Sequence, residues 1–175
     1  AEHLGGYDSR ENFKNYNGYV DELKSAFAGK DVVIVAAGPS LDKNVELLKN
    51  KKPNMIIMAV ETVFRKLIQL GVEVDYMIVA DANSRIYNHI SGLEEQQVPM
   101  LYLSTAYKGY SMNYQGSKYL ICQNGYNRAE DFAKQNNWNL YETGGSVSTT
   151  ALDVCIRLGA RSIASSIHCW NSAPS

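Results

Sequence analysis

The sequence lacks an excess of charge of either sign. Its 175 residues include 17 Lys and Arg against 18 Asp and Glu, which gives a formal net charge of −1 at pH 7. Proteins that bind DNA or RNA normally present a basic surface to the phosphate backbone. We therefore expect no nucleic-acid partner for this chain.

Cysteines and long hydrophobic runs are also scarce. The three cysteines, Cys122, Cys155 and Cys169, are widely spaced and form neither a disulfide framework nor a metal-binding motif. This usage is typical of a reducing compartment, so we expect a cytoplasmic location. No run reaches the roughly 18 apolar residues of a spanning helix, and no membrane partner is expected. The first residues do not resemble a signal peptide, and a start at Ala1 fits a segment cut from a longer protein.

Strand and helix patterns alternate regularly along the chain. Short apolar runs predict strands at residues 32–37, 55–60, 76–80, 100–103 and 119–122. Amphipathic spacing predicts helices at 41–52, around 63–68, at 128–136 and from 146 to 158. We therefore predict an α/β fold with a three-layer, mainly parallel Rossmann-like sheet and helices on both faces. The Tyr-, Gly- and Ser-rich residues 108–116 predict a loop over a site.

An amphipathic helix is expected before the first strand. Its apolar residues recur at spacings of three and four, and they are Phe13, Tyr16, Val20, Leu23 and Phe27. Asp8 and Glu11 resemble a capping box at its start. We divide the chain into an N-terminal helical extension at 1–30, a Rossmann-like nucleotide-binding domain at 31–168 and a tail at 169–175. We expect the end of that tail to be truncated or non-native.

Polar residues directly follow each of the five predicted strands. They are Gly38 to Ser40, Glu61, Asp81, Ser104 with Thr105, and Gln123 with Asn124. Ligands bind beyond the carboxyl ends of parallel strands, so this rim predicts a polar ligand site. Glu61 and Asp81 are the catalytic candidates, because carboxylates bind hydroxyls, hold divalent metals or act as general bases. The alternative for Glu61 is electrostatic stabilisation of a helix N-terminus.

Two glycine-led turns are candidate phosphate sites. One separates the first strand from its helix, and the other precedes the last helix. A helix start offers free N–H groups and a favourable dipole to an anion, although it can equally be a well-capped helix without a ligand. No Lys follows the glycines of the second turn, which excludes a Walker motif there. The binding candidates are Gly38, Pro39, Ser40, Gly144, Gly145, Ser146 and Thr149.

These motifs resemble those of the motility accessory factor (Maf) glycosyltransferases and of the related archaeal 6-hydroxymethylpterin pyrophosphokinases. The similar segments are 24–48, 59–61, 74–81 and 144–159, within about residues 26–160. A looser similarity extends to bacterial sialyltransferases. The resemblance implies that the two glycine turns hold the phosphate and ribose of a nucleotide. It also implies that Glu61 and Asp81 bind hydroxyls or assist charge handling.

The resemblance further implies transfer of a nonulosonic, sialic-acid-like sugar from a CMP-sugar to Ser or Thr of flagellin. It implies no firm cofactor. The alternative is diphosphate transfer from ATP to a pterin, for which Mg²⁺ would be needed. A third alternative is a non-catalytic flagellin-binding module whose contact surface is the tyrosine-rich region from Tyr102 to Tyr126, although half-buried packing is the commoner role of such tyrosines. Residues 161–175 are not apolar enough for the last strand of the family, so we expect nucleotide binding without complete catalysis.

Overall fold

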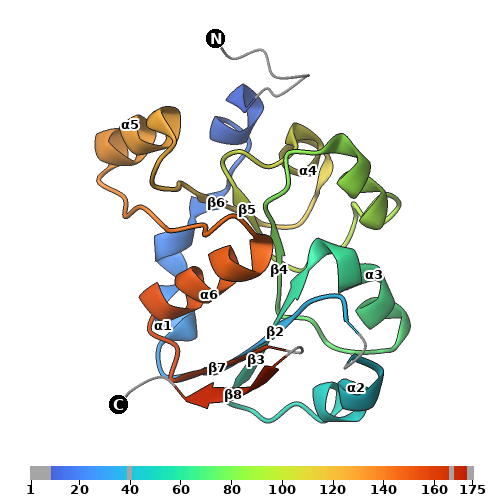
Figure 1. Cartoon of the computed structure of the whole chain (residues 1–175). Helices are drawn as coiled ribbons and strands as arrows, with labels where there is room; N and C mark the ends of the chain where they lie inside the picture. The colour runs from blue at the N-terminus through green and yellow to red at the C-terminus, as the bar shows by residue number, and fades with distance from the viewer. Residues whose placement is uncertain (1–8, 39–40, 166–167, 173–175) are drawn as a thin grey trace.

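The fold is built on one eight-stranded sheet. A computed structural model describes residues 9–38, 41–165 and 168–172, which leaves Asp8, Pro39 and Ser40 outside the described residues. The strand order is β1-β6-β5-β4-β3-β2-β7-β8, and every neighbouring pair is parallel except β7 with β8 (Figure 1). The strands are β1 (Gly18–Tyr19), β2 (Asp31–Val35), β3 (Met55–Val60), β4 (Tyr76–Val79), β5 (Met100–Leu103), β6 (Lys118–Ile121), β7 (Ser162–Ser165) and β8 (His168–Ser172).

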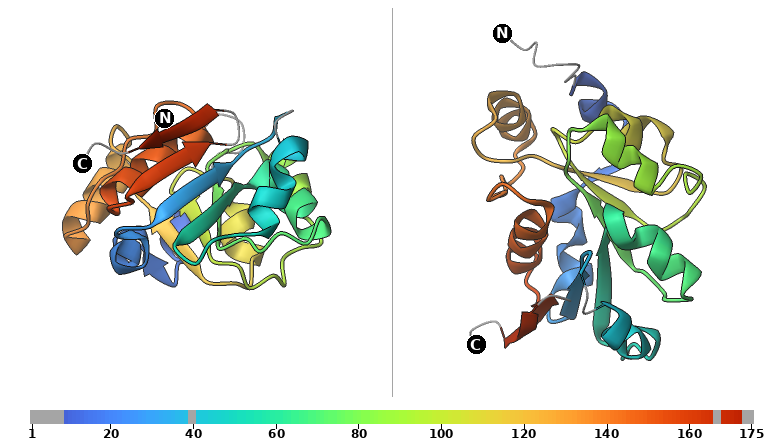
Figure 2. Two further views of the ribbon diagram at one scale, coloured as in Figure 1. Left: turned by 90° about the horizontal axis from the view of Figure 1, so that it is seen from below. Right: turned by 45° about the vertical axis from the view of Figure 1, so that its right-hand side comes forward.

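Helices cover both faces of this sheet. From β2 to β6 the chain adds one strand at a time in a single direction, so right-handed crossovers put the connecting helices on one face. These are α2 (Leu41–Lys49), α3 (Glu61–Gln69), η3 (Ser84–His89) and α4 (Lys108–Asn113). The chain then returns to β7 through α5 (Asn127–Asn136) and α6 (Val147–Arg157). Figure 2 shows α6 and α1 (Lys24–Phe27) opposite α2 and α3. The predicted three-layer, Rossmann-like α/β fold is confirmed.

The central strands are buried on both faces. In β3 the residues from Ile57 to Ala59 have no exposed surface, and in β4 the same holds from Met77 to Val79. A parallel strand covered by helices on both sides needs apolar residues at every position rather than at every second one. This is why the unbroken apolar runs located these strands to within one or two residues.

The predicted continuous N-terminal helix is wrong. The chain instead forms the 3₁₀ helices η1 (Arg10–Phe13) and η2 (Val20–Leu23), with β1 between them and α1 after them. The helix is interrupted at Asn17, whose N–H donates to the Lys118 carbonyl at 2.8 Å and whose side chain accepts from the Lys118 N–H at 2.8 Å. At Gly18 a Cβ would lie 3.1 Å from the Tyr119 ring, so the chain approaches β6 closely. Pairing with the sheet edge overrides the helical spacing of the apolar residues.

The predicted loop at residues 108–116 is also wrong. The segment contains the helix α4, and Tyr110 and Tyr114 within it are 0% and 2% exposed. Tyr107, Tyr110 and Tyr114 follow the three- and four-residue spacing of a buried helical face. The glycine and serine content concealed this spacing, and the segment is part of the core rather than a cover over a site.

The last parallel strand is present, which corrects the expectation for residues 161–175. β7 pairs with β2 in parallel, with Ile163 opposite Val32 and Ala164 opposite Val33. Ile163 and Ala164 are buried at 8% and 6% exposure. These two buried apolar residues are enough for β7 to join the sheet, because the next strand, β8, pairs with its other edge. The low overall apolarity of residues 161–175 therefore failed to predict this strand.

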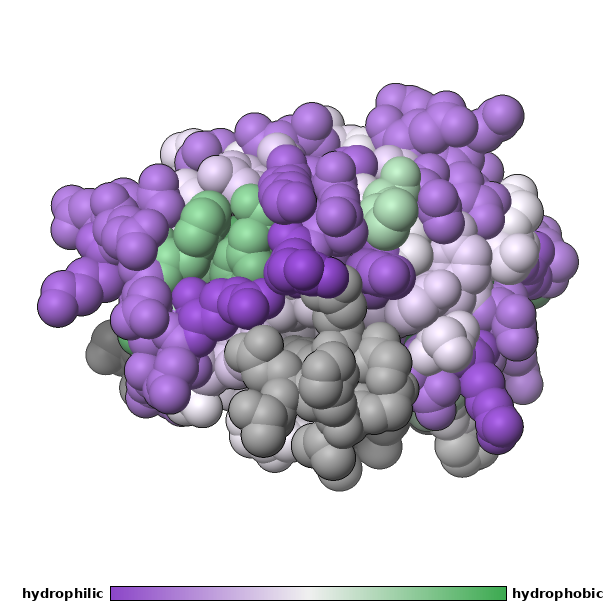
Figure 3. Space-filling view, turned by 90° about the horizontal axis from the view of Figure 1, so that it is seen from above, coloured by the Kyte–Doolittle hydropathy of each residue, from purple (hydrophilic) through white to green (hydrophobic). Residues whose placement is uncertain are grey.

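The described surface carries few large hydrophobic side chains. Seen from above, it is mostly hydrophilic with small hydrophobic areas (Figure 3). The exposed large hydrophobic residues are Leu47, Met112, Leu152 and Ile156, which belong to three different helices. Among the described residues no helix combines the length and apolarity needed to cross a membrane.

Candidate functional site

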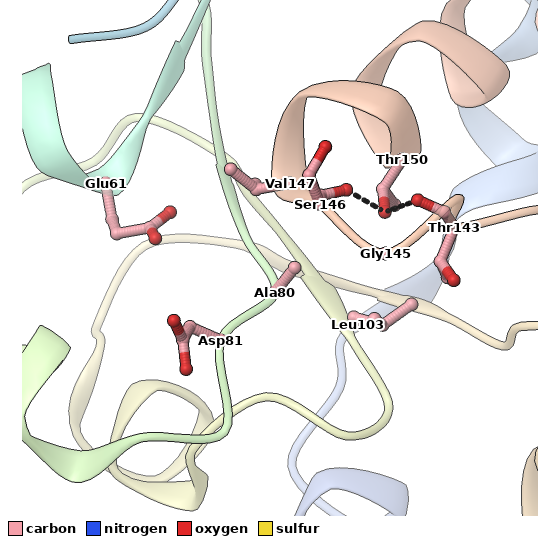
Figure 4. Close-up of a pocket in the computed structure, with 9 residues that line it drawn as sticks. All are labelled: Glu61, Ala80, Asp81, Leu103, Thr143, Gly145, Ser146, Val147 and Thr150. Atoms are coloured by element: carbon pink, nitrogen blue, oxygen red, sulfur yellow. Dashed lines mark hydrogen bonds between the residues drawn. The ribbon is translucent and has the colours of Figure 1, made fainter.

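A pocket of about 490 Å³ opens where β3, β4 and β5 end and α6 begins (Figure 4). This volume suits a small-molecule ligand. One side is formed by residues at or just after the three strand ends, and the other side by the turn and first residues of α6. The lining residues are Glu61, Ala80, Asp81, Leu103, Thr143, Gly145, Ser146, Val147 and Thr150.

The turn before α6 depends on its two glycines. Gly144 and Gly145 have φ values of +55° and +85°, a region that side chains other than hydrogen disfavour. Ser146 then caps the helix: its hydroxyl accepts from the Thr149 N–H at 3.1 Å, and the Thr149 hydroxyl accepts from the Ser146 N–H at 3.2 Å. This reciprocal capping box holds the turn in one conformation.

The first turn of α6 is left with free donors beside the pocket. Val147 and Ser148 are its first two residues, and α-helix geometry gives their N–H groups no intrahelical acceptor. The helix dipole adds a partial positive charge at the same end. The lining residues include no Lys, Arg or His, so within the described pocket this helix start is the main source of positive potential.

Thr149 was predicted to be a binding residue, but Thr150 is the threonine of α6 that lines the pocket. The Thr149 hydroxyl donates to the Thr143 carbonyl and takes part in the capping box, and Thr149 does not line the pocket. Thr150, which was not among the binding residues predicted from the sequence, lines the pocket and is 1% exposed. Its hydroxyl donates to the Ser146 carbonyl at 2.9 Å and more weakly to the Thr143 carbonyl at 3.4 Å (Figure 4).

Glu61 is a buried carboxyl group on the opposite side of the pocket. It is the first residue of α3, is only 3% exposed, and its Oε2 atom has no hydrogen-bond partner. Burial raises the pKa of Glu61 from its ordinary value of 4.5 to about 7; its own backbone N–H opposes this, and the charge of Asp81 adds to it. Helix stabilisation alone would keep the carboxyl ionised and exposed. An unpartnered, buried carboxyl in a pocket is instead typical of a functional group.

Asp81 follows β4 and lies near Glu61, and Figure 4 shows both side chains in the same part of the pocket. It is exposed, and its Oδ1 accepts the Asn83 N–H at 2.8 Å. Its carbonyl accepts the Tyr107 N–H at 2.8 Å, which ties the loop after β4 to the start of α4. The structure thus brings both predicted carboxylates into one pocket with Gly145 and Ser146.

Replacing Glu61 with Gln is expected to stabilise the fold at alkaline pH. A folded-state pKa above the unfolded value means that the native state binds more protons between pH 4.5 and 7, so stability falls as pH rises through that window. The loss is about 3 kcal/mol above pH 7. Urea unfolding should find Glu61→Gln more stable than wild type by about this amount at pH 8 and nearly equal at pH 4. Glu46→Gln, the same change at an exposed position, is the matched control, and equal stabilities of Glu61→Gln and wild type at pH 8 would contradict the expectation.

The remaining rim residues mostly bond to one another. The Ser104 hydroxyl donates to Gln123 Oε1 at 2.5 Å, and Gln123 Nε2 donates to the Thr105 hydroxyl at 3.0 Å. Asn124 donates to Glu142 at 3.0 Å. These groups close the ends of β5 and β6 rather than line the pocket, and only Leu103 from this region contributes to the lining.

The first glycine turn is described only in part. Gly38 follows β2 and is not among the lining residues, whereas Pro39 and Ser40 lie outside the described residues. Its role as a phosphate site therefore stays a prediction. Gly144 does not line the pocket either. It shapes the second turn, where a Cβ would lie 3.0 Å from the Thr149 side chain.

Comparison with known proteins agrees with this architecture. The chain is similar in structure to a MAf glycosyltransferase from Magnetospirillum magneticum AMB-1, with a TM-score of 0.69 and 18% identity over 91% of this chain and 27% of that chain. At this identity the likeness shows a shared fold, and the chain spans about a quarter of the length of that enzyme. No curated protein matches the sequence. A family model described as 6-hydroxymethylpterin diphosphokinase MptE-like matches residues 9–164. The match covers most of the chain and confirms the resemblance seen in the sequence: this protein belongs to the 6-hydroxymethylpterin diphosphokinase MptE-like family.

Proposed function

We propose that this domain is a cytoplasmic transferase that binds a nucleotide-linked donor in the pocket between α3 and α6. The donor phosphate lies at the start of α6, and the transferred group and its acceptor lie toward Glu61 and Asp81. The proposed donor is a CMP-activated nonulosonic sugar, and the proposed acceptor is a Ser or Thr hydroxyl of flagellin. The observation that carries this proposal is the pairing of a glycine-led helix start with a buried carboxyl in one pocket.

The two sides of the pocket suit the two demands of such a transfer. A departing phosphate is stabilised by N–H groups and a helix dipole that are already oriented, as at the start of α6. The acceptor hydroxyl has to lose its proton to a base whose pKa lies near the working pH. Glu61, with a pKa raised to about 7 mainly by burial, meets that condition. The similarity in fold to a MAf glycosyltransferase supports the same interpretation.

Calorimetric titration with CMP and with a CMP-sialic acid tests the proposal. We expect CMP to bind with a dissociation constant in the micromolar to low millimolar range, and cytidine to bind far more weakly because it lacks the phosphate. Folded protein that shows no heat with CMP at millimolar concentration would contradict the proposed donor.

A second candidate is diphosphate transfer from ATP to a pterin, which the description of the matched family favours. This reaction would use Mg²⁺, and the residues fit: Glu61 Oε2 is unpartnered and the Asp81 carboxylate shares its pocket. Magnesium is commonly held by one or two carboxylates together with substrate phosphates, whose charge it neutralises. Among the described residues no group of three His, Cys, Asp or Glu could hold a metal without such help. Binding of ATP that requires MgCl₂, with no binding of CMP, would favour this candidate.

The third alternative, a non-catalytic flagellin-binding module, has less support. It relied on a contact surface formed by the tyrosines between positions 102 and 126. Tyr102, Tyr110 and Tyr114 are at most 2% exposed, and Tyr107, Tyr119 and Tyr126 pack partly buried against the core. These tyrosines therefore build the interior, and little of their surface is available to a protein partner.

A further inference from the structure

Two buried side-chain atoms among the described residues have no hydrogen-bond partner, namely Glu61 Oε2 and the Tyr110 hydroxyl. Their residues are 3% and 0% exposed. Buried polar groups are paired in the great majority of cases, and an unpaired one needs an explanation. Glu61 lines the pocket, and Tyr110 is connected to the pocket through Tyr107, whose N–H donates to the Asp81 carbonyl.

Tyr110 differs in this respect from the other buried tyrosines. The Tyr102 hydroxyl donates to the Asn12 carbonyl at 2.6 Å, and the Tyr114 hydroxyl donates to the Val98 carbonyl at 2.5 Å. The Tyr141 hydroxyl donates to Asp21 at 2.5 Å. Each of these hydroxyls has a hydrogen-bond partner in the ligand-free protein, whereas the Tyr110 hydroxyl has none.

The surroundings of Tyr110 connect it to the loop that carries Asp81. Its ring packs against those of Tyr87 at 5.4 Å and Tyr107 at 6.3 Å, and Tyr107 is bonded through its N–H to Asp81. Burial raises the pKa of the Tyr110 phenol, and the nearby charges of Glu61 and Asp81 raise it further. The phenol thus stays protonated and can only donate to a carboxylate.

Other titratable groups around Glu61 are few. The elements packed against α3 are β3, β4 and η3. β4 leads into Asp81, and η3 carries Arg85, Tyr87 and His89. Asp81 is the charged side chain that acts on the pKa of Glu61, and it disfavours ionisation. A donor that favours the ionised form has to come from another residue, and the Tyr110 phenol, on which the charge of Glu61 acts, is such a donor without a partner of its own.

We propose that Tyr110 is a positioning residue, whose hydroxyl donates a hydrogen bond to Glu61 when that carboxyl is ionised and so holds it ready to accept a proton. Its use in catalysis rests on the proposed function. In the transfer step the acceptor oxygen forms the new bond to the transferred group as its proton passes to Glu61. The bond from that group to the donor phosphate breaks, and its electron pair leaves with the phosphate. Tyr110 releases the carboxyl as Glu61 becomes neutral.

The pairing is tested in the ligand-free protein by NMR titration of ¹³C-labelled glutamate side chains. The Glu61 signal is assigned by its absence in Glu61→Gln, and we expect its midpoint above the ordinary value of 4.5, because burial disfavours the ionised form. Tyr110→Phe should raise this midpoint by about one unit, because the ionised form loses a charge-assisted hydrogen bond. Tyr114→Phe is the matched control, since it removes a buried hydroxyl bonded elsewhere, and should leave the midpoint unchanged. An unchanged midpoint in Tyr110→Phe would overturn the proposal.

A measurement on the wild type covers the case in which Tyr110→Phe fails to fold. In infrared difference spectra with ring-labelled tyrosine, one phenol C–O band should shift across the Glu61 midpoint and stay constant in Glu61→Gln. A tyrosine band that does not respond would overturn the proposal. Both measurements use protein without nucleotide, so absence of CMP binding would contradict the proposed function and leave the pairing standing.

Discussion

Asn12→Ala should destabilise the protein by about 4 kcal/mol, because a single substitution leaves several buried polar groups without partners. Asn12 has no exposed surface. Its Nδ2 donates to the carbonyls of Ser104 at 2.9 Å and Ala106 at 2.6 Å, and its Oδ1 accepts from the Ser111 hydroxyl at 2.7 Å. Each of these groups would cost about 1–3 kcal/mol if left unpaired and dry.

The effect of this substitution would reach the candidate site. Asn12 belongs to η1 and bonds the loop after β5 on one side and α4 on the other, so it fastens the N-terminal segment to the end of the sheet that carries the pocket. Urea unfolding measures the loss. Asn15→Ala is the matched control, since Asn15 is only partly buried and bonds to nearby Glu11, and it should change stability by less than about 0.5 kcal/mol. A loss below about 1 kcal/mol for Asn12→Ala would show that water replaces the lost bonds.

The fold could be predicted from the sequence where one local pattern determines the structure. The central strands β2 to β5 are buried on both faces, and their unbroken apolar runs have few other interpretations. The N-terminal segment failed because its structure depends on distant residues: Asn17 pairs with Lys118, which is far away in the sequence. No periodicity within residues 9–27 carries that information, so tertiary pairing overrode local helix spacing.

The site could be predicted where sequence position and geometry coincide. Glu61 and Asp81 follow from the rule that ligands bind at the carboxyl ends of parallel strands, Gly145 and Ser146 follow from the glycine-led helix start, and all four line the pocket. Tyr110 could not be found in this way, because it follows no strand end and lies in a helix, α4, where the sequence predicted a loop. The rule also predicted too many ligand-binding residues. A polar residue at a strand end can equally bond to a neighbouring side chain, as Ser104 does to Gln123.

Val147→Asp should strongly weaken the binding of phosphate-containing ligands while leaving the protein folded. Val147 is the first residue of α6 and lines the pocket. An Asp carboxylate there would lie beside the N–H groups proposed to hold the donor phosphate. Two like charges about 4 Å apart repel by about 4 kcal/mol near a protein surface, so we expect the affinity for CMP to fall at least about 100-fold.

This substitution separates binding from stability because a negative charge at a helix start is favourable. An acidic residue in the first turn contributes about 0.3–1 kcal/mol through the helix dipole, so the urea midpoint of Val147→Asp should match or exceed that of Val147→Asn, which loses the same apolar packing. Val147→Asn has the same shape without the charge and should bind CMP within about fivefold of wild type. Calorimetry with CMP and with cytidine completes the comparison, since cytidine has no phosphate to repel. If Val147→Asp and Val147→Asn bind CMP equally well, the phosphate does not lie at the start of α6, and the orientation proposed for the donor is wrong.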